Sequence, residues 1–531
     1  MDATSEQLVE FQTHGQDIPY LLGHWADARP EHPALVWQPR DDQQARTWTY
    51  RELLTDVERL AAGLATRGIN RGDKVLIHSE NSPEMVMSWL ACATVGAVAV
   101  TTNTKSVTSE LEYFASKAQC VAAITQPQFA AMVAEAAPAL RWIAVTADNS
   151  GEPATRPAGS WVPFDDLLAE TSDVWSGRPI EPMLPFGIMF TSGTTSRPKA
   201  VVHTHANAIW ASRTGPTNID LGPDDRYLIS LPLFHVNAQC WSFFAVLGAG
   251  ATAVLMPKWS TSRFWDMVTR YGITHISALP FTFPALMDPE RPAEHTLRVG
   301  VFGFVSPGLD AMLGISLYGA FGMTETVTHS IVSKPNQNLP DRSMGHAAPG
   351  YEIAVVNQDT GALCDPGEPG ELWLRGTRGV QLFLEYFDNP KANDAAFEDG
   401  WFKTGDVVEV GVGGNVFYRE RDKDLLKVGG ENVSAREVEE VVASVGGIAQ
   451  VQVVGKHHEF LDQVVVAFVI TGADAPDGAT LEASVIGACQ ERLASFKVPR
   501  AVYVVDAFPL GTLDKVLKKE LRDMADARPP V

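Results

Sequence analysis

The sequence predicts an α/β protein with a large N-terminal domain of two parallel-type sheets covered by helices, a β-rich subdomain, and a small mobile α+β C-terminal domain. Three observations support this fold class. Short apolar runs alternate with helical patterns through the first four-fifths of the chain, turn residues then become frequent, and a charged segment precedes the last helix and strand signals. A chain of 531 residues also exceeds the size at which one hydrophobic core stops growing, so we expect more than one domain.

The alternation is clearest in two strand and helix pairs. A strand over 74–78 precedes a helix near 83–93, and a strand over 120–125 precedes a helix near 129–136. Strands that alternate with helices form parallel sheets whose faces the helices cover. Further apolar runs are expected as strands of the same sheets, namely 142–146, 187–190, 226–230, 251–255 and 275–278.

The domain boundaries follow from changes in composition. After about residue 340, Gly, Pro and Asp turns surround short strands such as 371–375 and 416–418, which predicts a β-rich subdomain over about 340–422. Beyond the charged segment 419–424, helix and strand signals continue to the end. We therefore expect an N-terminal domain over 1–422 and a mobile C-terminal domain of ordinary size over 423–531.

Residues 85–104 form a stretch of 20 positions without a charged side chain, which is long enough to cross a bilayer. The stretch is rich in Ala, Gly, Ser and Thr, and we expect a buried helix over 84–95 that runs through Gly96 into a strand over 97–102. The first residues carry no basic segment before an apolar run, so we expect no secretory signal. Five separated cysteines without a CxxC pair fit a reducing compartment, and we expect a cytoplasmic protein.

The acidic balance of the chain limits its partners. The formal net charge is −22, whereas nucleic acid and anionic membranes bind large basic surfaces that displace their counterions. We therefore expect neither of these as a partner.

A Gly- and Thr-rich segment directly follows the apolar strand 187–190. It reads Thr191-Ser-Gly-Thr-Thr195 and is closed by Lys199. Small residues allow backbone N–H groups to approach phosphate oxygens, hydroxyl groups add donors, and the lysine adds a positive charge. The segment is not a Walker motif, which has the form GxxxxGK before Ser or Thr and a helix. Taken by itself, such a segment is equally typical of a polar surface turn.

Six motifs together indicate a family. They are TSGTTSRPKA, YGAFGMTET, YFDNP, GWFKTGD, RERDKDLLKVGGENVSAREVEE and FKVPR, in this order between residues 48 and 522. The chain resembles the adenylate-forming superfamily of acyl-CoA synthetases, peptide-synthetase adenylation domains and luciferases. It is most similar to the crotonobetaine/carnitine-CoA ligase branch, because it shares Ser196, FHVNAQC around His235, and GGENVS at 429–434.

The resemblance implies a site for ATP. The residues implied to hold the β- and γ-phosphates are Thr191, Ser192, Gly193, Thr194, Thr195 and Lys199. Thr324 would contact the α-phosphate, while Glu325 and Thr191 would bind Mg²⁺, a hard cation that takes carboxylate, hydroxyl and phosphate oxygens. Phe321 would lie against the adenine, and Tyr318 and Gly319 belong to the same nucleotide-binding segment.

The later motifs imply the ribose site and a hinge. Asp406 would accept hydrogen bonds from both ribose hydroxyls, and Arg421 would bind the sugar or phosphate edge. Lys423 falls at the hinge position of the family, with charged neighbours that keep the linker solvated. The nucleotide-binding set is completed by Lys423, Lys427, Gly429 and Gly430.

Two further residues are implied to act in catalysis. Lys515 would stabilise negative charge that accumulates on oxygen during adenylation, and His235 would be a gate beside the adenylate. Leu513-Asp514 stand before Lys515 where the family has Ser or Thr followed by Gly, so Asp514 could hold the lysine away from its target. Lys518 and Lys519 are expected to face solvent.

The implied reaction is the ATP-dependent activation of a carboxylic acid to an acyl-adenylate, with release of pyrophosphate, followed by transfer to CoA. The expected cofactors and partners are ATP, Mg²⁺, CoA and a small carboxylic acid, and relatives suggest a monomer or a homodimer. Two alternatives stay open. One is transfer to another acceptor, such as a carrier-protein thiol, an amine or another nitrogen nucleophile, and the other is a non-catalytic nucleotide-binding homologue.

The identity of the acyl group stays open as well. Between Phe302 and Tyr318, which lines the acyl pocket in relatives, the chain departs from the family pattern and its helix is shorter. Asn237 stands where the crotonobetaine branch has Asp, so one candidate partner for a quaternary ammonium is missing, and an aromatic cage would be required instead. The aromatic residues nearby in sequence are expected to pack in the core, and they are Phe234, Trp241, Phe243 and Phe244. A neutral aromatic or medium-sized acyl group therefore fits the sequence as well as a charged one.

Overall fold

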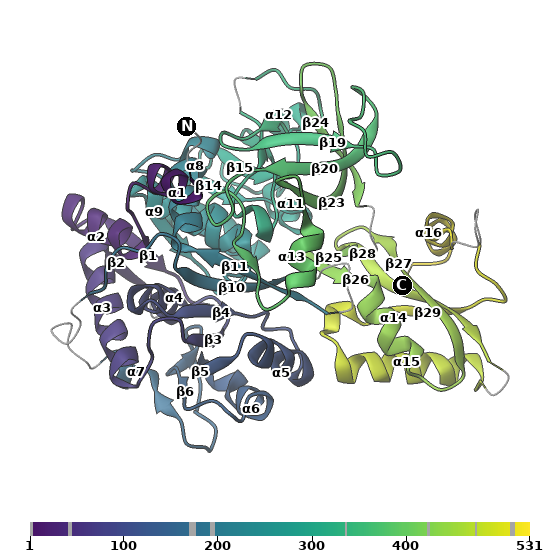
Figure 1. Cartoon of the computed structure of the whole chain (residues 1–531), viewed down its shortest axis with the longest axis horizontal. Helices are drawn as coiled ribbons and strands as arrows, with labels where there is room; N and C mark the ends of the chain where they lie inside the picture. Colours follow the sequence, from purple (N-terminus) through teal and green to yellow (C-terminus); the bar gives the residue numbers. More distant parts are fainter. Residues whose placement is uncertain are drawn as a thin grey trace.

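The computed structural model describes residues 4–40, 45–168, 177–191, 197–334, 337–421, 425–472, 475–509 and 516–530. Strands and helices alternate in the first part of the chain, a strand-rich region follows, and a smaller unit of helices and strands ends the chain (Figure 1). The α/β fold class predicted from the sequence is confirmed.

The first large sheet has a parallel centre and antiparallel edges. Parallel pairing joins β16, β15, β14, β12, β13 and β1, whereas β17, β18 and β2 are antiparallel to their neighbours. In order across the sheet, its strands are β18 (His346–Ala347), β17 (Ile331–Val332), β16 (Ser316–Phe321), β15 (Val299–Phe302), β14 (His275–Ser277), β12 (Arg226–Ile229), β13 (Thr252–Leu255), β1 (Pro33–Trp37) and β2 (Arg46–Thr49).

The second large sheet has the same plan. Its centre, from β10 through β4, β3, β5 and β6 to β9, is parallel, and β11 and β21 are antiparallel at one edge. In order across the sheet, its strands are β21 (Glu385–Tyr386), β11 (Lys199–Thr204), β10 (Pro185–Thr191), β4 (Val98–Thr101), β3 (Lys74–His78), β5 (Cys120–Thr125), β6 (Ile143–Val145) and β9 (Val162–Pro163). A small hairpin, β7 (Asp148–Asn149) and β8 (Glu152–Pro153), lies between β6 and β9 in the chain.

Helices cover the faces of both sheets. They are α1 (Ser5–Thr13), α2 (Ile18–Ala28), α3 (Tyr50–Thr66), α4 (Pro83–Val95), α5 (Thr108–Lys117), α6 (Pro127–Ala136), α7 (Phe164–Leu168), α8 (His205–Ile219), α9 (Phe244–Ala249), α10 (Phe264–Tyr271), α11 (Phe283–Leu286) and α12 (Pro307–Leu313). Val75 and Ile77 of β3 pack in a core shared with α3, α4, α8 and α9, and Leu76 packs on the other face with α5 and α6. In β13, Leu255 faces the shared core and Val254 faces α10, α11 and α12. Burial on both faces explains why these strands read as continuous apolar runs.

The uncharged stretch 85–104 folds as the sequence predicts. It forms most of α4, turns at Gly96 with a φ of 87°, and continues as β4. The described side chains of α4 are buried except Glu84, which is only partly exposed, because the helix lies in the core shared by the two large sheets. No helix in the described part of the chain is both long and apolar enough to span a membrane.

The strand-rich region is an antiparallel sheet, as its Gly, Pro and Asp turns predict. Its strands are β19 (Glu352–Val356), β20 (Pro369–Arg375), β23 (Trp401–Val410), β22 (Phe397–Glu398) and β24 (Val416–Arg421), and α13 (Pro390–Ala396) lies beside it. Residues 4–421 with this sheet are called the N-terminal unit below.

The C-terminal unit comprises the described residues of 425–530, at the yellow end of the chain in Figure 1. Its sheet consists of β26 (Glu431–Ser434), β25 (Leu425–Val428), β28 (Asp462–Thr471), β27 (Ile448–His458) and β29 (Ala501–Val504). Its helices include α14 (Ala435–Ala443), α15 (Gly478–Arg492) and α16 (Lys518–Asp526). The helices α14 and α15 bury one apolar core against the sheet, while α16 packs in a second core on β27 and β28.

Lys518 departs from the sequence prediction. Its ammonium lies 2.8 Å from the carboxylate of Glu439, and only 17% of its side chain is exposed, because the start of α16 lies close to α14. Lys519 is exposed, as predicted.

Candidate active site

The phosphate-loop segment joins two antiparallel strands. Thr191 ends β10, Lys199 begins β11, and the two residues are cross-strand partners. The loop residues Ser192, Gly193, Thr194 and Thr195 lie outside the described residues, so their assignment to ATP stays a prediction. The hydroxyl oxygen of Thr191 is buried and has no hydrogen-bond partner among the described residues.

Tyr386 connects the lysine of this hairpin to the predicted metal ligand Glu325. The ammonium of Lys199 lies 4.5 Å from the centroid of the Tyr386 ring, and the Tyr386 hydroxyl donates a 2.9 Å hydrogen bond to Oε1 of Glu325. Strand β21, which contains Tyr386, pairs with β11, and the main chain of Phe383 donates to the carbonyl of Glu325. Glu325 is 4% exposed, so the structure holds this carboxylate in a fixed position beside the hairpin of β10 and β11.

His203 holds the neighbouring residue Thr324. Its Nε2–H donates a 2.8 Å hydrogen bond to the Thr324 carbonyl. Burial lowers the pKa of His203 to about 4, although the bond to Thr324 opposes this shift, and the ring is therefore neutral at pH 7. Sequence reasoning missed His203. The period of two along a strand could have found it, because Lys199 and His203 lie on the same face of β11.

Steric contacts explain why a glycine stands at position 322, two residues before Thr324. A Cβ atom at Gly322 would lie 2.6 Å from Cζ2 of Trp241 and 2.7 Å from the carbonyl oxygen of Thr328. Neither distance can be accommodated without a shift of the segment that holds Thr324 and Glu325.

Three other residues of the same motif lie on or at the end of β16. Phe321 is partly exposed at the end of the strand. The Tyr318 hydroxyl donates to Asp220 at 2.8 Å, so it is directed at the end of α8, and Gly319 is confined by the carbonyl of Ser343. The nucleotide roles of these residues stay predictions.

The predicted ribose carboxylate, Asp406, is 4% exposed on β23. The Tyr418 hydroxyl donates to its Oδ1 at 3.3 Å. Its main chain is the cross-strand partner of Arg421 on β24, which agrees with their expected closeness, although the Arg421 side chain lies outside the described part of the structure. Gly405 precedes Asp406 with a φ of 75°, which favours glycine there.

The Gly429-Gly430 turn of the C-terminal unit reaches the N-terminal unit. Both glycines have positive φ values, of 58° and 87°, and a Cβ at Gly430 would lie 3.5 Å from Leu279. Lys427, before the turn, is exposed and its ammonium lies 5.2 Å from the centroid of the Tyr418 ring. The turn therefore meets the N-terminal unit near the start of η5 (Pro280–Thr282).

Glu431, directly after this turn, binds the predicted gate residue His235. Nε2–H of His235 donates to Glu431 at 2.9 Å, and Asn103 and Lys105 approach the same carboxylate at 3.1 and 3.5 Å. Burial alone would raise the pKa of Glu431, but His235 and Lys105 outweigh it and hold the pKa at about 2. Sequence reasoning quoted the GGENVS motif without assigning a role to its glutamate. Lys423 and Lys515, the predicted hinge and catalytic lysines, lie outside the described residues.

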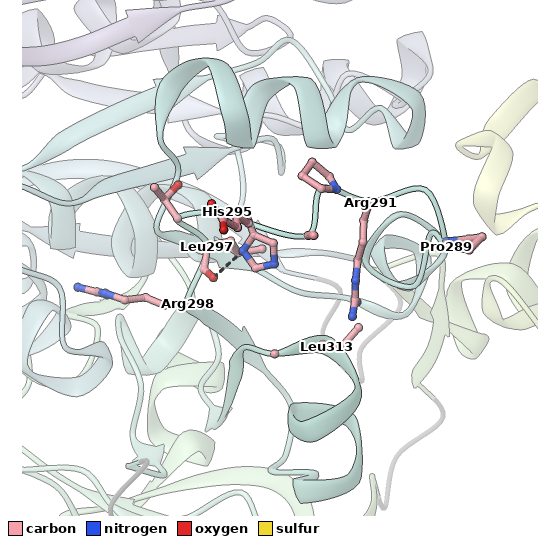
Figure 2. Close-up of a pocket in the computed structure, with 11 residues that line it drawn as sticks. Pro289, Arg291, His295, Leu297, Arg298 and Leu313 are labelled. Carbon is pink, nitrogen blue, oxygen red and sulfur yellow. Dashed lines mark hydrogen bonds between the residues drawn. The ribbon is translucent and has the colours of Figure 1, made fainter.

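An open hollow of about 670 Å³ lies elsewhere, before β15 (Figure 2). Three of the basic side chains that line it make contacts within the protein. Arg291 donates to main-chain carbonyls, His295 donates to the carbonyl of Leu297, and Arg298 forms an ion pair with Asp225. Among the described residues, none of those predicted for the nucleotide site lines this hollow, and we assign no role to it.

Solved structures of acyl-CoA synthetases are similar to nearly the whole chain. A double mutant of o-succinylbenzoate CoA synthetase from Bacillus subtilis, bound with its product analogue OSB-NCoA, has a TM-score of 0.81 at 27% identity, covering 96% of this chain and 98% of that chain. The Bacillus subtilis enzyme in complex with AMP has a TM-score of 0.68 at the same identity and coverage. ATP-bound MatB from Rhodopseudomonas palustris has a TM-score of 0.69 at 25% identity, covering 96% of this chain and 99% of that chain.

Sequence comparisons lead to the same class of protein. Residues 22–387 match the family described as AMP-binding enzyme, and residues 437–515 match the AMP-binding enzyme C-terminal domain. Crotonobetaine/carnitine-CoA ligases from Escherichia coli O8 (strain IAI1) and Shigella flexneri are each 32% identical to this chain, covering 96% of it and 99% of the relatives. The chain therefore belongs to the AMP-binding enzyme family, and it is an AMP-forming acyl-CoA ligase that uses ATP.

Proposed function

We propose that this ligase forms its product in two half-reactions at one nucleotide site. In the first, a carboxylate oxygen of the acid attacks the α-phosphorus of ATP, the bond from that phosphorus to the bridging oxygen breaks, and pyrophosphate leaves. In the second, the CoA thiol gives its proton to water and its sulfur attacks the acyl carbon, and the bond from that carbon to the phosphate oxygen breaks as AMP leaves. The observation that carries this proposal is a cluster of four residues. Lys199 and Tyr386 lie on the adjoining strands β11 and β21, and Thr324 and Glu325 lie beside them in the short helix η6 (Thr324–Thr326).

The phosphates of ATP are proposed to bind where β10 ends at Thr191 and β11 begins at Lys199. The Lys199 ammonium supplies positive charge there, and Ser192, Gly193, Thr194 and Thr195 supply small residues and hydroxyl donors in the chain between Thr191 and Lys199. Thr324 would contact the α-phosphate, where His203 fixes its main chain. Positive charge and donors that are already in place stabilise the charge that develops as pyrophosphate leaves.

The same residues fit Mg²⁺. Glu325 offers a carboxylate and Thr191 a buried hydroxyl oxygen without a partner among the described residues, and hard oxygen ligands together with phosphate suit this cation. When bound, Mg²⁺ would neutralise phosphate charge. Tyr386 would orient the carboxylate through its hydrogen bond to Oε1.

Asp406 and Arg421 are proposed to bind the ribose, and Phe321 to lie against the adenine. Asp406 supports this role because its carboxylate is a buried acceptor, and the Tyr418 hydroxyl approaches its Oδ1 at 3.3 Å. Two ribose hydroxyls on one carboxylate give a bidentate contact that fixes the nucleoside.

We further propose that residues 423–531 form a mobile domain that rotates about Lys423 between the half-reactions. The present arrangement resembles the complex with the CoA product analogue, with a TM-score of 0.81, more than the AMP complex, with 0.68. The contact between His235 and Glu431 would then belong to the thioester-forming arrangement, and Lys515 would act in the other one. Moving one domain allows a single nucleotide site to serve both steps.

The acyl group is proposed to be neutral rather than a quaternary ammonium. The Asn237 side chain accepts a 2.7 Å hydrogen bond from the Ser277 hydroxyl, so it is occupied and uncharged. Phe234, Phe243 and Phe244 are buried in the main core, where they cannot form an aromatic cage for a cation. This differs from the substrates in the names of the relatives that are 32% identical.

Isotope exchange tests the first half-reaction. Labelled pyrophosphate should enter ATP in the presence of a neutral acid from a panel that also holds crotonobetaine, carnitine and o-succinylbenzoate. Lys515→Ala should lower the exchange by about 10²–10³-fold, whereas Lys519→Ala, at an exposed lysine nearby, should not. Absence of exchange with every acid would contradict adenylation, and exchange with carnitine alone would contradict the neutral acyl group. Consumption of CoA thiol with the same acid tests the second half-reaction.

A further inference from the structure

A buried ion cluster joins the two units at α5 and α14. The ammonium of Lys497, in η7 (Ser495–Lys497), lies 2.5 Å from Glu110 on α5 and 2.9 Å from Glu437 on α14. Lys497 is 5% exposed and Glu110 is 8% exposed. Both carboxylates therefore meet the ammonium away from water.

Burial makes this cluster sensitive to the loss of a partner. Desolvation alone would lower the pKa of Lys497, but Glu437 and Glu110 outweigh it and raise the pKa above its ordinary value. The same lysine opposes the rise in pKa that burial causes at Glu437. A buried charge that loses a partner without gaining water is strongly destabilised. Each arrangement of the two units must therefore give Lys497, Glu110 and Glu437 either an ion partner or water.

The two carboxylates belong to different units of the chain. Glu437 and Lys497 both belong to the C-terminal unit, so their contact is kept when that unit moves. Glu110 belongs to the N-terminal unit, so its contact with Lys497 exists only while the units are docked as described. Ser109 donates to the carbonyl of Arg492 at 3.4 Å, which makes the start of α5 a docking edge for the C-terminal unit.

Glu110 also has a separate task within its own helix. Its Oε2 accepts a 3.1 Å hydrogen bond from the main chain of Val107, at the start of α5. Glutamate or glutamine at this third helical position can make this bond. When the units separate, Glu110 keeps its helix contact and gains water, while Lys497 keeps Glu437. Separation therefore leaves no group without a partner or solvent.

We propose that Glu110 is a positioning residue that, through Lys497, holds the C-terminal unit in the arrangement for thioester formation. The inference rests on the two half-reactions proposed above, because only an enzyme that alternates between arrangements has a use for a contact made in one of them. The higher TM-score against the complex with the CoA product analogue assigns the present arrangement to the second half-reaction. Glu110 touches none of the reacting groups and acts through Lys497.

The test is Glu110→Gln in the full-length enzyme. Glutamine keeps the helix contact and removes the charge that faces Lys497. The control is Glu52→Gln, because Glu52 makes the same kind of contact at the start of α3, with the main chain of Thr49 at 2.8 Å, and has no contact with the C-terminal unit among the described residues. Glu110→Gln should slow the reaction of preformed acyl-adenylate with CoA by about tenfold or more, while pyrophosphate exchange stays within about twofold of the unaltered enzyme. Equal effects on both half-reactions, or no effect on either, would overturn the proposal.

Small-angle X-ray scattering of the unliganded protein provides a second readout that requires no substrate. The unaltered enzyme and Glu52→Gln should give the profile of the docked arrangement, and Glu110→Gln should give a changed profile with its melting temperature retained. An unchanged profile for Glu110→Gln would overturn the proposal by itself. If no acid supports exchange in the unaltered enzyme, the proposed function fails, and scattering still decides whether Glu110 holds the units together.

Discussion

The imidazole of His235 and the carboxylate of Glu431 meet at 2.9 Å across the boundary between the N-terminal and C-terminal units. His235 follows β12 in the first large sheet, and Glu431 begins β26 after the Gly429-Gly430 turn. Lys105 approaches the same carboxylate at 3.5 Å. With Asn103, which donates to it at 3.1 Å, one glutamate of the C-terminal unit therefore contacts three residues of the N-terminal unit.

Replacing this glutamate should impair the second half-reaction. Glu431→Gln removes the charge that pairs with His235 and Lys105 in a buried place, and we expect thioester formation to fall by about tenfold or more. Single-turnover measurement with preformed acyl-adenylate and CoA checks this. Glu459→Gln, an exposed glutamate of the same unit, is the control and should leave the rate unchanged. A loss confined to pyrophosphate exchange would contradict the expectation.

Tyr386→Phe should weaken adenylation. The substitution removes the hydrogen bond to Glu325 but keeps the ring beside Lys199, so it isolates the orientation of the carboxylate. A hydrogen bond to a charged group contributes about 1.5–3 kcal/mol, which corresponds to roughly a tenfold to hundredfold loss of exchange rate. A titration of the exchange rate with Mg²⁺ should also show a higher half-saturating concentration. Tyr503→Phe is the control, because the Tyr503 hydroxyl has no partner among the described residues. Equal Mg²⁺ dependence in Tyr386→Phe and the unaltered enzyme would argue against a metal role for Glu325.

Gly322→Ala should lower both stability and pyrophosphate exchange, although it adds only one methyl group. The added methyl group would lie 2.7 Å from a backbone carbonyl, which cannot move away as a flexible side chain can. Overpacking of this kind costs about 1–3 kcal/mol and would displace Thr324 and Glu325, so both the melting temperature and pyrophosphate exchange should fall. Gly308→Ala in α12 is a matched control, because a Cβ there meets nothing within 4 Å. Normal exchange by Gly322→Ala would show that this steric contact does not position Thr324 and Glu325.

The stability of the protein should fall steeply as the pH drops below about 6.5. Burial lowers the pKa of His78 and His329 to about 3 and of His203 and His275 to about 4, and it lowers the pKa of His205 well below its ordinary value. Their neutral forms are kept in the folded state, and the unfolded chain binds the protons first. Each histidine therefore contributes stability that is complete above about pH 6.5 and is lost toward its folded pKa, with a slope of about 1.4 kcal/mol per pH unit.

Denaturant unfolding between pH 5 and pH 8 measures this slope. His329→Leu should reduce the slope by about 1.4 kcal/mol per pH unit, the share of one proton. His329 suits this test because its buried ring nitrogens have no hydrogen-bond partner among the described residues. Stability that does not change between pH 5 and pH 6.5 would contradict the expected linkage.

Much of the fold followed from local patterns. The strands 74–78 and 120–125 were predicted with the bounds that β3 and β5 have, because a strand buried on both faces is a continuous apolar run. A helix over 84–95, a turn at Gly96 and a strand over 97–102 were predicted from composition and length, and α4 and β4 lie there within one residue of those bounds. Lys518 was misjudged, since its pairing with Glu439 depends on where α16 meets α14.

The sequence by itself determined the family and the type of reaction, because the motifs predicted to bind ATP are local strings in a fixed order along the chain. Only the tertiary structure decided which residues support them. His203 contacts Thr324, Glu431 contacts His235, and Lys497 contacts Glu110. The residues of each pair lie far apart in the sequence. These contacts arise from the packing of separate sheets and units, and no local period or propensity in the chain records which charged side chain a distant helix will bring beside another.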